Sequence, residues 1–370
     1  MKTMSFSFKA LLGVALAAAS AQAAPITAGD LVIYRVGDGS AALGTTAASV
    51  FLDEYTTGGS LVQSIALPNV GGPGGLTAVG NSTTEGVISR SQNGSALIFT
   101  GYQKAAGGTS PAADTYLTTS RVIGTLNAAG TVNTATTLIN DNGATTANTI
   151  RSATSVDGTS AFWVSTSSRV SYDASPFVSG GTVQIDARNS RQVNMSGNTL
   201  FAANGSTVIT GKVQTYGTLP TGATAATPIV TLTTADAVNG FALFDLDAGV
   251  AGDDTLYALS TVENLLRKYT FNGATWTASG SISAGGALNL AGVVSGSTVN
   301  LFLTSGTTLS AETDASGYNA NITGSVATLT TAGTFTGFRG IGLFLPVPEP
   351  TTLSLALVGA GLLARRRRRA

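Results

Sequence analysis

A short pattern recurs along this chain: an apolar start, a turn that contains glycine, and a second apolar run. It reads ISRSQNGSALIFTGY from Ile88, IRSATSVDGTSAFWVST from Ile150 and SRQVNMSGNTLFAANG from Ser190. Looser copies begin at Gly240 and Asn289, and a last fragment, FRGIGLFLP, begins at Phe338. Their spacing follows from aligning Arg90, Arg151, Arg191, Phe241, Ala291 and Arg339, which gives steps of 61, 40, 50, 50 and 48 residues. Repeats of about this length bury their apolar faces only by stacking against one another.

Each copy is followed by further strand candidates, which makes about four strands per repeat. The clearest candidate is Leu265–Ile282, two strands joined by a turn at Asn272-Gly273. The last copy has a single strand, Arg339–Leu345, whereas the N-terminal part has three strands without a first one: LVIYRVG, SVFLDEYT and LVQSIAL. We therefore predict an all-β fold, a six-bladed β-propeller whose last blade is closed by the N-terminal strands. A β-sandwich or a β-helix is the alternative.

The composition supports strands and excludes several kinds of chemistry. The chain has 46 glycines and only 10% charged residues, which favours short strands and tight turns. It has no cysteine and no histidine, so disulfides, thiolate metal sites, thiol nucleophiles and Ser-His-Asp triads are excluded. Without the charged residues of the two ends, 12 basic and 18 acidic residues remain, a net charge of −6. This balance argues against nucleic acid as a partner.

The first 23 residues are typical of a secretory signal peptide. Lys2 and Lys9 form a charged start, and Ala10–Ala19 form an apolar stretch. Ala21 and Ala23 then supply the small residues of a signal peptidase cleavage site. A buried helix is the alternative. We expect an exported protein whose mature chain begins near Ala24.

The last residues form a second targeting segment. Pro348-Glu349-Pro350 is followed by a run of small and apolar residues, Thr351–Ala364, and then by Arg365–Arg369. The run is short for a membrane span, which needs about 20 residues, but an arginine cluster stays in the cytoplasm and its long side chains reach the interface. We therefore expect the tail to anchor the exported body in the inner membrane before processing. A plain C-terminal anchor would have the same run and the same arginines.

The order of these three parts resembles the PEP-CTERM sorting signal of Gram-negative bacteria, and the resemblance is confined to residues 347–370. It implies that an exosortase, a membrane protease, recognises the tail and removes it, and that the host makes extracellular polysaccharide. Pro348 and Pro350 favour an extended segment, which suits a protease. The predicted parts are a signal peptide (1–23), a propeller-like extracellular domain (24–346) and the sorting signal (347–370).

Four arginines start the predicted innermost strands: Arg90, Arg151, Arg191 and Arg339. Because innermost strands line the central channel of a propeller, a ring of arginines there could bind an anion, such as the carboxylate of a uronic or sialic acid. The alternative is that each arginine ties its blade to carbonyl or carboxylate groups of a neighbouring blade.

A second candidate site is the segment DLDAGVAGDD, which contains Asp245, Asp247, Asp253 and Asp254. Oxygen-only clusters suit Ca²⁺, although the spacing differs from that of an EF-hand. The alternative is a hairpin loop in which the aspartates cap turns. We predict no other cofactor and no catalytic residue.

Two functions agree with these features. The first is a non-enzymatic protein of the cell surface or matrix, whose propeller presents a binding scaffold to extracellular polysaccharide. The second is a carbohydrate-active enzyme, a glycosidase or a lyase. A pocket with two carboxyl groups about 5–10 Å apart would favour the enzyme. A shallow channel whose arginines are all paired would favour the scaffold.

Overall fold

The computed structural model describes residues 23–138, 143, 145–174 and 182–345, so the signal peptide up to residue 22 and the sorting tail lie outside the described residues. Short strands dominate this part of the chain, with one 3₁₀ turn, η1 (Pro111–Ala113). Strands in the middle of each sheet, such as β6 (Ala96–Tyr102) and β18 (Thr255–Ser260), are buried on both faces. They are nearly continuous apolar runs because other sheets cover both faces. The outer strand β3 (Leu61–Ala66) is instead largely exposed.

The strands form six antiparallel four-stranded blades. The first blade has the order β25 (Gly337–Leu343), β1 (Leu31–Val36), β2 (Ala47–Tyr55) and β3. The second contains β5 (Ser89–Arg90), β6, β7 (Arg121–Asn127) and β8 (Val132–Leu138). A short strand, β4 (Thr77–Val79), pairs with both β2 and β6 and joins these two blades into one nine-stranded sheet.

The other four blades are consecutive in the sequence. The third contains β9 (Ile150–Thr154), β10 (Phe162–Thr166), β11 (Val170–Asp173) and β12 (Val183–Asp186). The fourth contains β13 (Ser190–Ser196), β14 (Thr199–Asn204), β15 (Gly211–Thr218) and β16 (Thr227–Thr231). The fifth contains β17 (Val238–Phe244), β18, β19 (Leu265–Phe271) and β20 (Trp276–Ser283), and the sixth contains β21 (Asn289–Ser295), β22 (Thr298–Thr304), β23 (Thr308–Asp314) and β24 (Ala327–Thr331).

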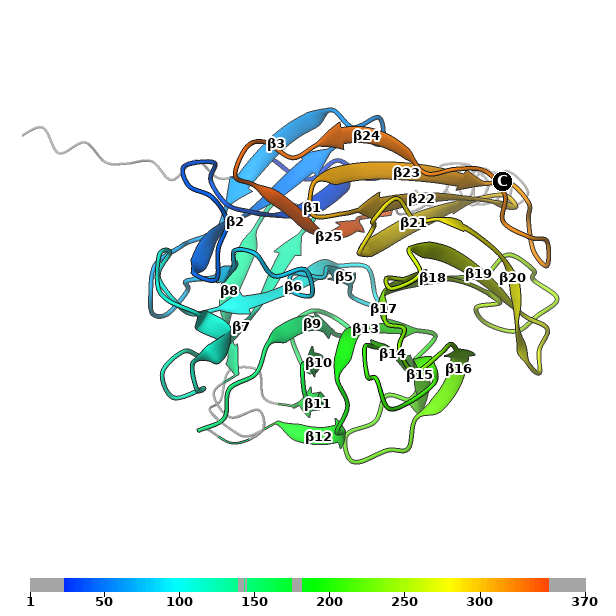
Figure 1. Ribbon diagram of the computed structural model, residues 1–370, viewed down its shortest axis with the longest axis horizontal. Helices are drawn as coiled ribbons and strands as arrows, with labels where there is room; N and C mark the ends of the chain where they lie inside the picture. Colours follow the sequence, from blue (N-terminus) through cyan, green and yellow to red (C-terminus); the bar gives the residue numbers. More distant parts are fainter. Residues whose placement is uncertain (1–22, 139–142, 144, 175–181, 346–370) are drawn as a thin grey trace, which may run out of the picture.

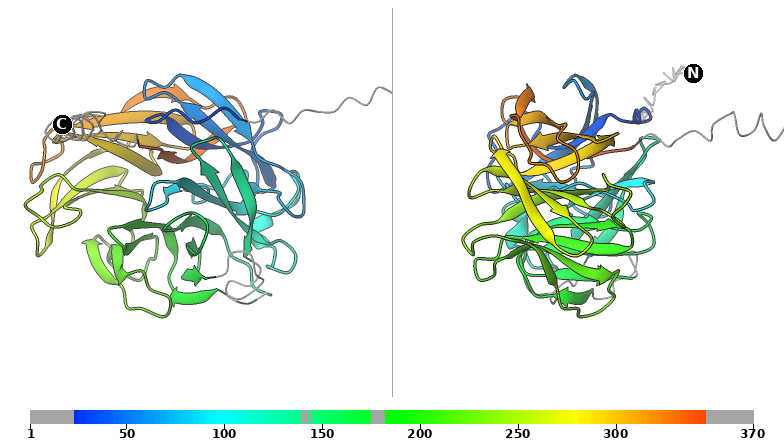
Figure 2. Two further views of the ribbon diagram at one scale, coloured as in Figure 1. Left: turned by 180° about the vertical axis from the view of Figure 1, so that it is seen from behind. Right: turned by 90° about the vertical axis from the view of Figure 1, so that its right-hand side faces the viewer.

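The blades close into a ring, which Figure 1 shows from one end and Figure 2 from behind and from the side. Around the centre, each innermost strand contacts the next: β5, β9, β13, β17, β21 and β25, which returns to β5. The ring is closed by β25 from the C-terminal end, which pairs with β1 from the N-terminal end. The predicted six-bladed propeller and its mode of closure are therefore confirmed.

The apolar core is divided among the interfaces between blades. Six buried clusters are present in the described residues, and each combines side chains from two neighbouring blades. One of them joins Leu31 and Ile33 of β1 to Phe302 and Leu309 of the sixth blade. The ring is thus held by contacts between blades, and its closure completes the last cluster.

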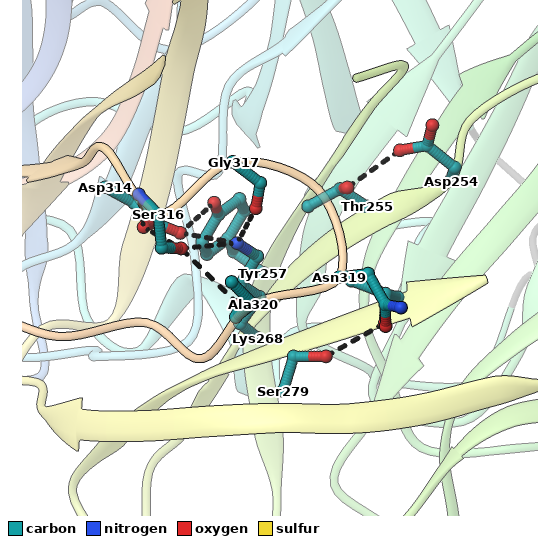
Figure 3. Close-up of polar contacts among 11 residues, drawn as sticks. Asp254, Thr255, Tyr257, Lys268, Ser279, Asp314, Ser316, Gly317, Asn319 and Ala320 are labelled. Atoms are coloured by element: carbon teal, nitrogen blue, oxygen red, sulfur yellow. Dashed lines mark hydrogen bonds and ion pairs between the residues drawn. The ribbon is translucent and has the colours of Figure 1, made fainter. Parts of the chain in front are cut away.

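Several charged side chains are buried between blades although the chain has few charges. Lys268 on β19 forms an ion pair of 2.9 Å with Asp314 at the end of β23, and their side chains are 0% and 1% exposed. The Lys268 ammonium group also donates to the carbonyl of Gly317 at 2.6 Å, while the Tyr257 hydroxyl donates to Asp314 at 2.5 Å. Figure 3 shows that these groups converge from the fifth and sixth blades. The ion pair therefore fastens two blades together.

Candidate functional site: the central pocket

The central channel of the ring opens into a pocket of about 430 Å³. Its walls are residues of five innermost strands, β5, β13, β17, β21 and β25, together with residues that flank these strands. The volume lies in the range of pockets that bind small molecules, about 300–1,000 Å³. The fold therefore provides one site to which five blades contribute.

The lining of the pocket combines polar and apolar groups. The polar side chains include Arg90, Gln92, Asn194, Ser196, Asp245 and Asp253. The apolar side chains include Phe241, Leu243, Phe244, Leu290, Val293 and Leu343. A pocket of this kind offers hydrogen-bond donors and acceptors beside surfaces that cover the apolar part of a ligand.

Three of the predicted arginines gather at the other end of the channel, where the innermost strands begin. Arg151 is 6% exposed and donates to the carbonyl of Ser190 at 2.7 Å and to the side chain of Asn189. Arg339 is 4% exposed and donates to the carbonyl of Gly80 at 2.9 Å. Each of these two arginines therefore ties its blade to a neighbour, as the alternative interpretation held.

The side chain of Arg191 lies beside them without a hydrogen bond to any described residue, and its guanidinium group packs on the backbone of Gly205. Burial lowers the pKa of Arg191 and Arg339. Burial, with the nearby charge of Arg191, also lowers the pKa of Arg151. All three remain cationic at neutral pH because a guanidinium group starts from a very high pKa.

Glu85 supplies a carboxyl group to this arginine cluster, and the sequence reasoning missed it. It lies in the loop between β4 and β5, is 4% exposed, and accepts from the Val79 N–H at 3.1 Å and the Tyr102 hydroxyl at 3.0 Å. Burial raises its pKa to about 7, although the two hydrogen bonds and the charges of Arg151 and Arg339 act in the opposite direction. No motif in the sequence marks this position, because only the ring brings it to the channel.

Arg90 does not join the other three arginines, so the alignment that placed it there is wrong. The N–H of Val87 bonds to the carbonyl of Arg151 at 3.2 Å, which puts Val87 level with Arg151. Arg90 comes three residues later, on the wall of the pocket. Its side chain has no hydrogen-bond or ion-pair partner among the described residues, and burial lowers its pKa. Arg90 is therefore the predicted arginine that is available to a ligand in the pocket.

The predicted calcium site is not assembled. Asp254 is fully buried, and its carboxylate accepts from the N–H groups of Leu246 and Asp247 and from the Thr255 hydroxyl. Asp247 accepts from the N–H of Gly249 at 2.9 Å. These two aspartates therefore cap the loop, as the alternative interpretation held. Within the described ranges no three acidic side chains are grouped as a metal site requires.

The other two aspartates of that segment, Asp245 and Asp253, line the pocket. Asp245 is exposed at the end of β17, whereas Asp253 is more enclosed. Burial raises the pKa of Asp253, a hydrogen bond with Ser196 lowers it, and the charges of Asp245 and Asp254 raise it. The pocket thus contains two carboxyl groups in different environments.

Comparison with known protein families identifies the tail. Residues 346–369 match the model of the PEP-CTERM protein-sorting motif. The chain carries a PEP-CTERM sorting signal. This signal belongs to exported proteins that an exosortase sorts, as the resemblance of the tail implied. The sorting residues Pro348, Glu349 and Pro350 lie outside the described residues, as does Ala21 of the signal peptide. The part of the chain that the structure describes contains no helix that is long and apolar enough to span a membrane.

Several solved structures are similar to the propeller at low sequence identity. The periplasmic gluconolactonase of Pseudomonas aeruginosa is 13% identical, with a TM-score of 0.47 over 84% of this chain and 99% of that one. A chain of a nidogen/laminin complex is 10% identical, with a TM-score of 0.46 over 85% and 98%. A putative 6-phosphogluconolactonase from Bacteroides uniformis is 13% identical, with a TM-score of 0.40 over 81% and 99%. No curated protein matches the chain.

Proposed function

We propose that this exported protein is a non-enzymatic binding scaffold of the cell surface or matrix, and that its central pocket binds acidic sugars of an extracellular polysaccharide. The observation that carries the proposal is the pocket itself, about 430 Å³ in volume, in which Arg90 has no partner among the described residues. The channel arginines are therefore not all paired, and the scaffold proposed here is one that binds a ligand through Arg90. A guanidinium group pairs with a carboxylate through two parallel hydrogen bonds. A uronic acid supplies such a carboxylate.

The rest of the lining suits a sugar. Asn194 offers its amide N–H groups to sugar hydroxyls, because its oxygen already accepts from the Met195 N–H at 2.9 Å, and the Ser196 hydroxyl is shared with Asp253. Phe244 and Val293 offer apolar surface for the C–H faces of a sugar ring. Gln192 is less available, because its side-chain oxygen accepts from the N–H of Phe241 at 2.8 Å and links two blades.

The test is calorimetric titration of the protein with polysaccharide fragments from the producing bacterium. We expect Arg90→Gln to weaken binding by about 10- to 100-fold, because a charge-assisted hydrogen bond contributes about 1.5–3 kcal/mol. Arg169→Gln is the matched control, since Arg169 is half-buried in the turn between β10 and β11 and does not line the pocket. Equal binding by the wild type and Arg90→Gln would show that the pocket is not the binding site. No binding by the wild type would refute the proposed function.

The two pocket carboxyl groups support a second candidate, a glycosidase or a lyase. Burial raises the pKa of Asp253, which is the property that a general acid needs, while Asp245 lies exposed in the same pocket. The test is the release of reducing ends from the host polysaccharide. An enzyme would lose this activity in Asp253→Asn while Arg90→Gln loses binding. If the wild-type protein binds fragments but releases no reducing ends, the enzyme candidate is refuted and the binding scaffold remains.

A further inference from the structure

The charged groups of the central pocket lie on opposite sides of the ring. Arg90 ends β5 of the second blade, Asp245 directly follows β17 of the fifth blade, and Asp253 lies in the loop between β17 and β18. The order of innermost strands around the centre places β5 and β17 three strands apart in either direction. The second and fifth blades therefore face each other across the pocket.

These opposite charges do not neutralise each other. Among the described residues, no ion pair joins Arg90 to a carboxyl group, and Asp245 has neither an ion-pair nor a hydrogen-bond partner. Burial alone lowers the pKa of Arg90. Burial and the charges of Asp245 and Asp254 raise the pKa of Asp253, so the charge of Arg90 is not among those that act on it. The pocket thus has a cationic side and an anionic side.

The two sides in between differ in polarity. The sixth and first blades contribute Leu290, Val293 and Leu343, whereas the fourth blade contributes Asn194. A sugar ring can therefore rest its C–H face on the apolar side while its hydroxyl groups meet the amide. A ligand held in this way extends from the cationic side of the pocket to the anionic side.

A purely acidic ligand suits only one of the two charged sides. Its carboxylate pairs with Arg90, but any negative charge close to Asp245 is repelled, because charges that are partly shielded from water interact strongly. A cationic group in the same place is attracted by the two aspartates. Complementary charges of this kind determine which ligand an interface selects.

We propose that the pocket selects a sugar unit that carries both charges: a carboxylate that pairs with Arg90, and a free ammonium group that pairs with Asp245 and Asp253. An acidic sugar linked to an amino sugar without an acetyl group is such a unit. This specificity rests on the proposed function of the pocket, since it names the kind of acidic polysaccharide that the pocket prefers.

The test is calorimetric titration with two disaccharides at about pH 6.5, where an amine of this kind is protonated. One is glucuronic acid β1,3-linked to galactosamine, whose amine is free, and the other is the same disaccharide with the amine acetylated. The variant is Asp245→Asn, because Asp245 is exposed and has no partner among the described residues. The matched control is Asp38→Asn, in the exposed turn after β1 and outside the pocket lining, where asparagine keeps the acceptor for the Ser40 N–H.

We expect the wild type and Asp38→Asn to bind the free-amine disaccharide at least 10-fold more tightly than the acetylated one, because acetylation removes a charge-assisted hydrogen bond. Asp245→Asn should bind the free-amine form about 5- to 10-fold more weakly than the wild type does. It should bind the acetylated form more tightly, because one carboxylate that repels the acidic sugar is gone. A residue with a merely structural role would shift both affinities in the same direction.

Equal binding of the two disaccharides by the wild type would overturn the inference. So would a preference that persists in Asp245→Asn, because it would reflect the size of the acetyl group. In both cases, fragments of the host polysaccharide that bind the wild type and bind Arg90→Gln more weakly would still uphold the proposed function. If the wild type binds neither disaccharide, the inference fails, and if it also binds no fragments, the proposed function fails with it.

Discussion

At the scale of single residues, the channel contains a carboxyl group whose charge depends on the fold. Glu85 is buried against Val79 and Tyr102 and faces Arg151 and Arg339. Neither arginine comes within 4.0 Å of the carboxylate to form an ion pair. Burial dominates, and the pKa of Glu85 rises from 4.5 to about 7. The folded chain therefore binds more protons than the unfolded chain between these two values.

The first prediction concerns the pH dependence that follows from Glu85. Because the proton is bound in the folded state, the free energy of unfolding should fall as pH rises through the window from 4.5 to about 7. Glu85→Gln keeps the acceptor for the Val79 N–H and removes this titration. Between pH 4.5 and pH 7, the free energy of unfolding of the variant should rise by on the order of 3 kcal/mol relative to that of the wild type. Urea unfolding across this range measures the difference, and parallel profiles for the two proteins would contradict it.

The second prediction concerns the ion pair between the fifth and sixth blades. Lys268→Met leaves the buried carboxylate of Asp314 without its cation, which should lower the free energy of unfolding by about 3–5 kcal/mol. The control is Lys104→Met, which breaks the pair of Lys104 and Asp114, whose side chains are 19% and 21% exposed. Lys104→Met should lower the free energy of unfolding by less than about 1 kcal/mol. Similar urea midpoints for the two variants would show that the burial of an ion pair does not determine how much stability is lost when it is broken.

Acid should weaken the same contact. Hydrogen bonds from Ser316 and Tyr257, together with Lys268, lower the pKa of Asp314 although burial opposes them. A lowered pKa gives stability that is complete above the unfolded value of about 3.9 and is lost as pH falls toward the folded value. We therefore expect the cost of Lys268→Met, measured by urea unfolding, to shrink below about pH 4. A constant cost across that range would contradict the assigned role of Asp314.

At the scale of elements, β25 both closes the ring and lines its central pocket. Three of its seven residues are glycine, and Gly340 donates its N–H to the carbonyl of Gly86 at 2.9 Å. A Cβ at Gly340 would collide with the backbone of Gly86 and Ile88. This close approach explains why the last copy of the repeat is rich in glycine.

The third prediction tests this approach. Gly340→Val should lower the free energy of unfolding by about 3 kcal/mol, because the backbone of the segment just before β5 cannot move aside as a side chain could. Gly222→Val is the matched control, since no atom lies within 4 Å of its added Cβ. The control should change stability by less than about 0.5 kcal/mol. Chemical unfolding measures both, and an unaffected Gly340→Val would mean that β25 shifts easily in the ring.

At the scale of the whole molecule, the repeat and the two incomplete ends were enough to predict the ring, because strand period and spacing are local properties of the sequence. The site was predicted less well. Alignment on arginine placed Arg90 three residues from its true level, because β5 has only two residues and sets no register of its own. Glu85 was missed because it follows a bridging strand, β4, that belongs to no repeat. For the aspartates the sequence left calcium binding and turn capping open, and backbone N–H groups that use the oxygens of Asp254 and Asp247 agree with turn capping.

The last prediction concerns processing, which determines where the whole molecule resides. If an exosortase removes the tail, peptides from protein released by its native host should end near Pro350 and lack Arg365–Arg369. Glu349→Gln keeps both prolines and changes only the charge of the motif, so it should leave the chain intact in the membrane fraction while Thr331→Ala, on the exposed end of β24, is processed normally. Mass spectrometry of C-terminal peptides distinguishes the two forms. An arginine tail retained on wild-type protein would make the segment a permanent anchor, and the protein would then act at the membrane instead of at the cell surface or in the matrix.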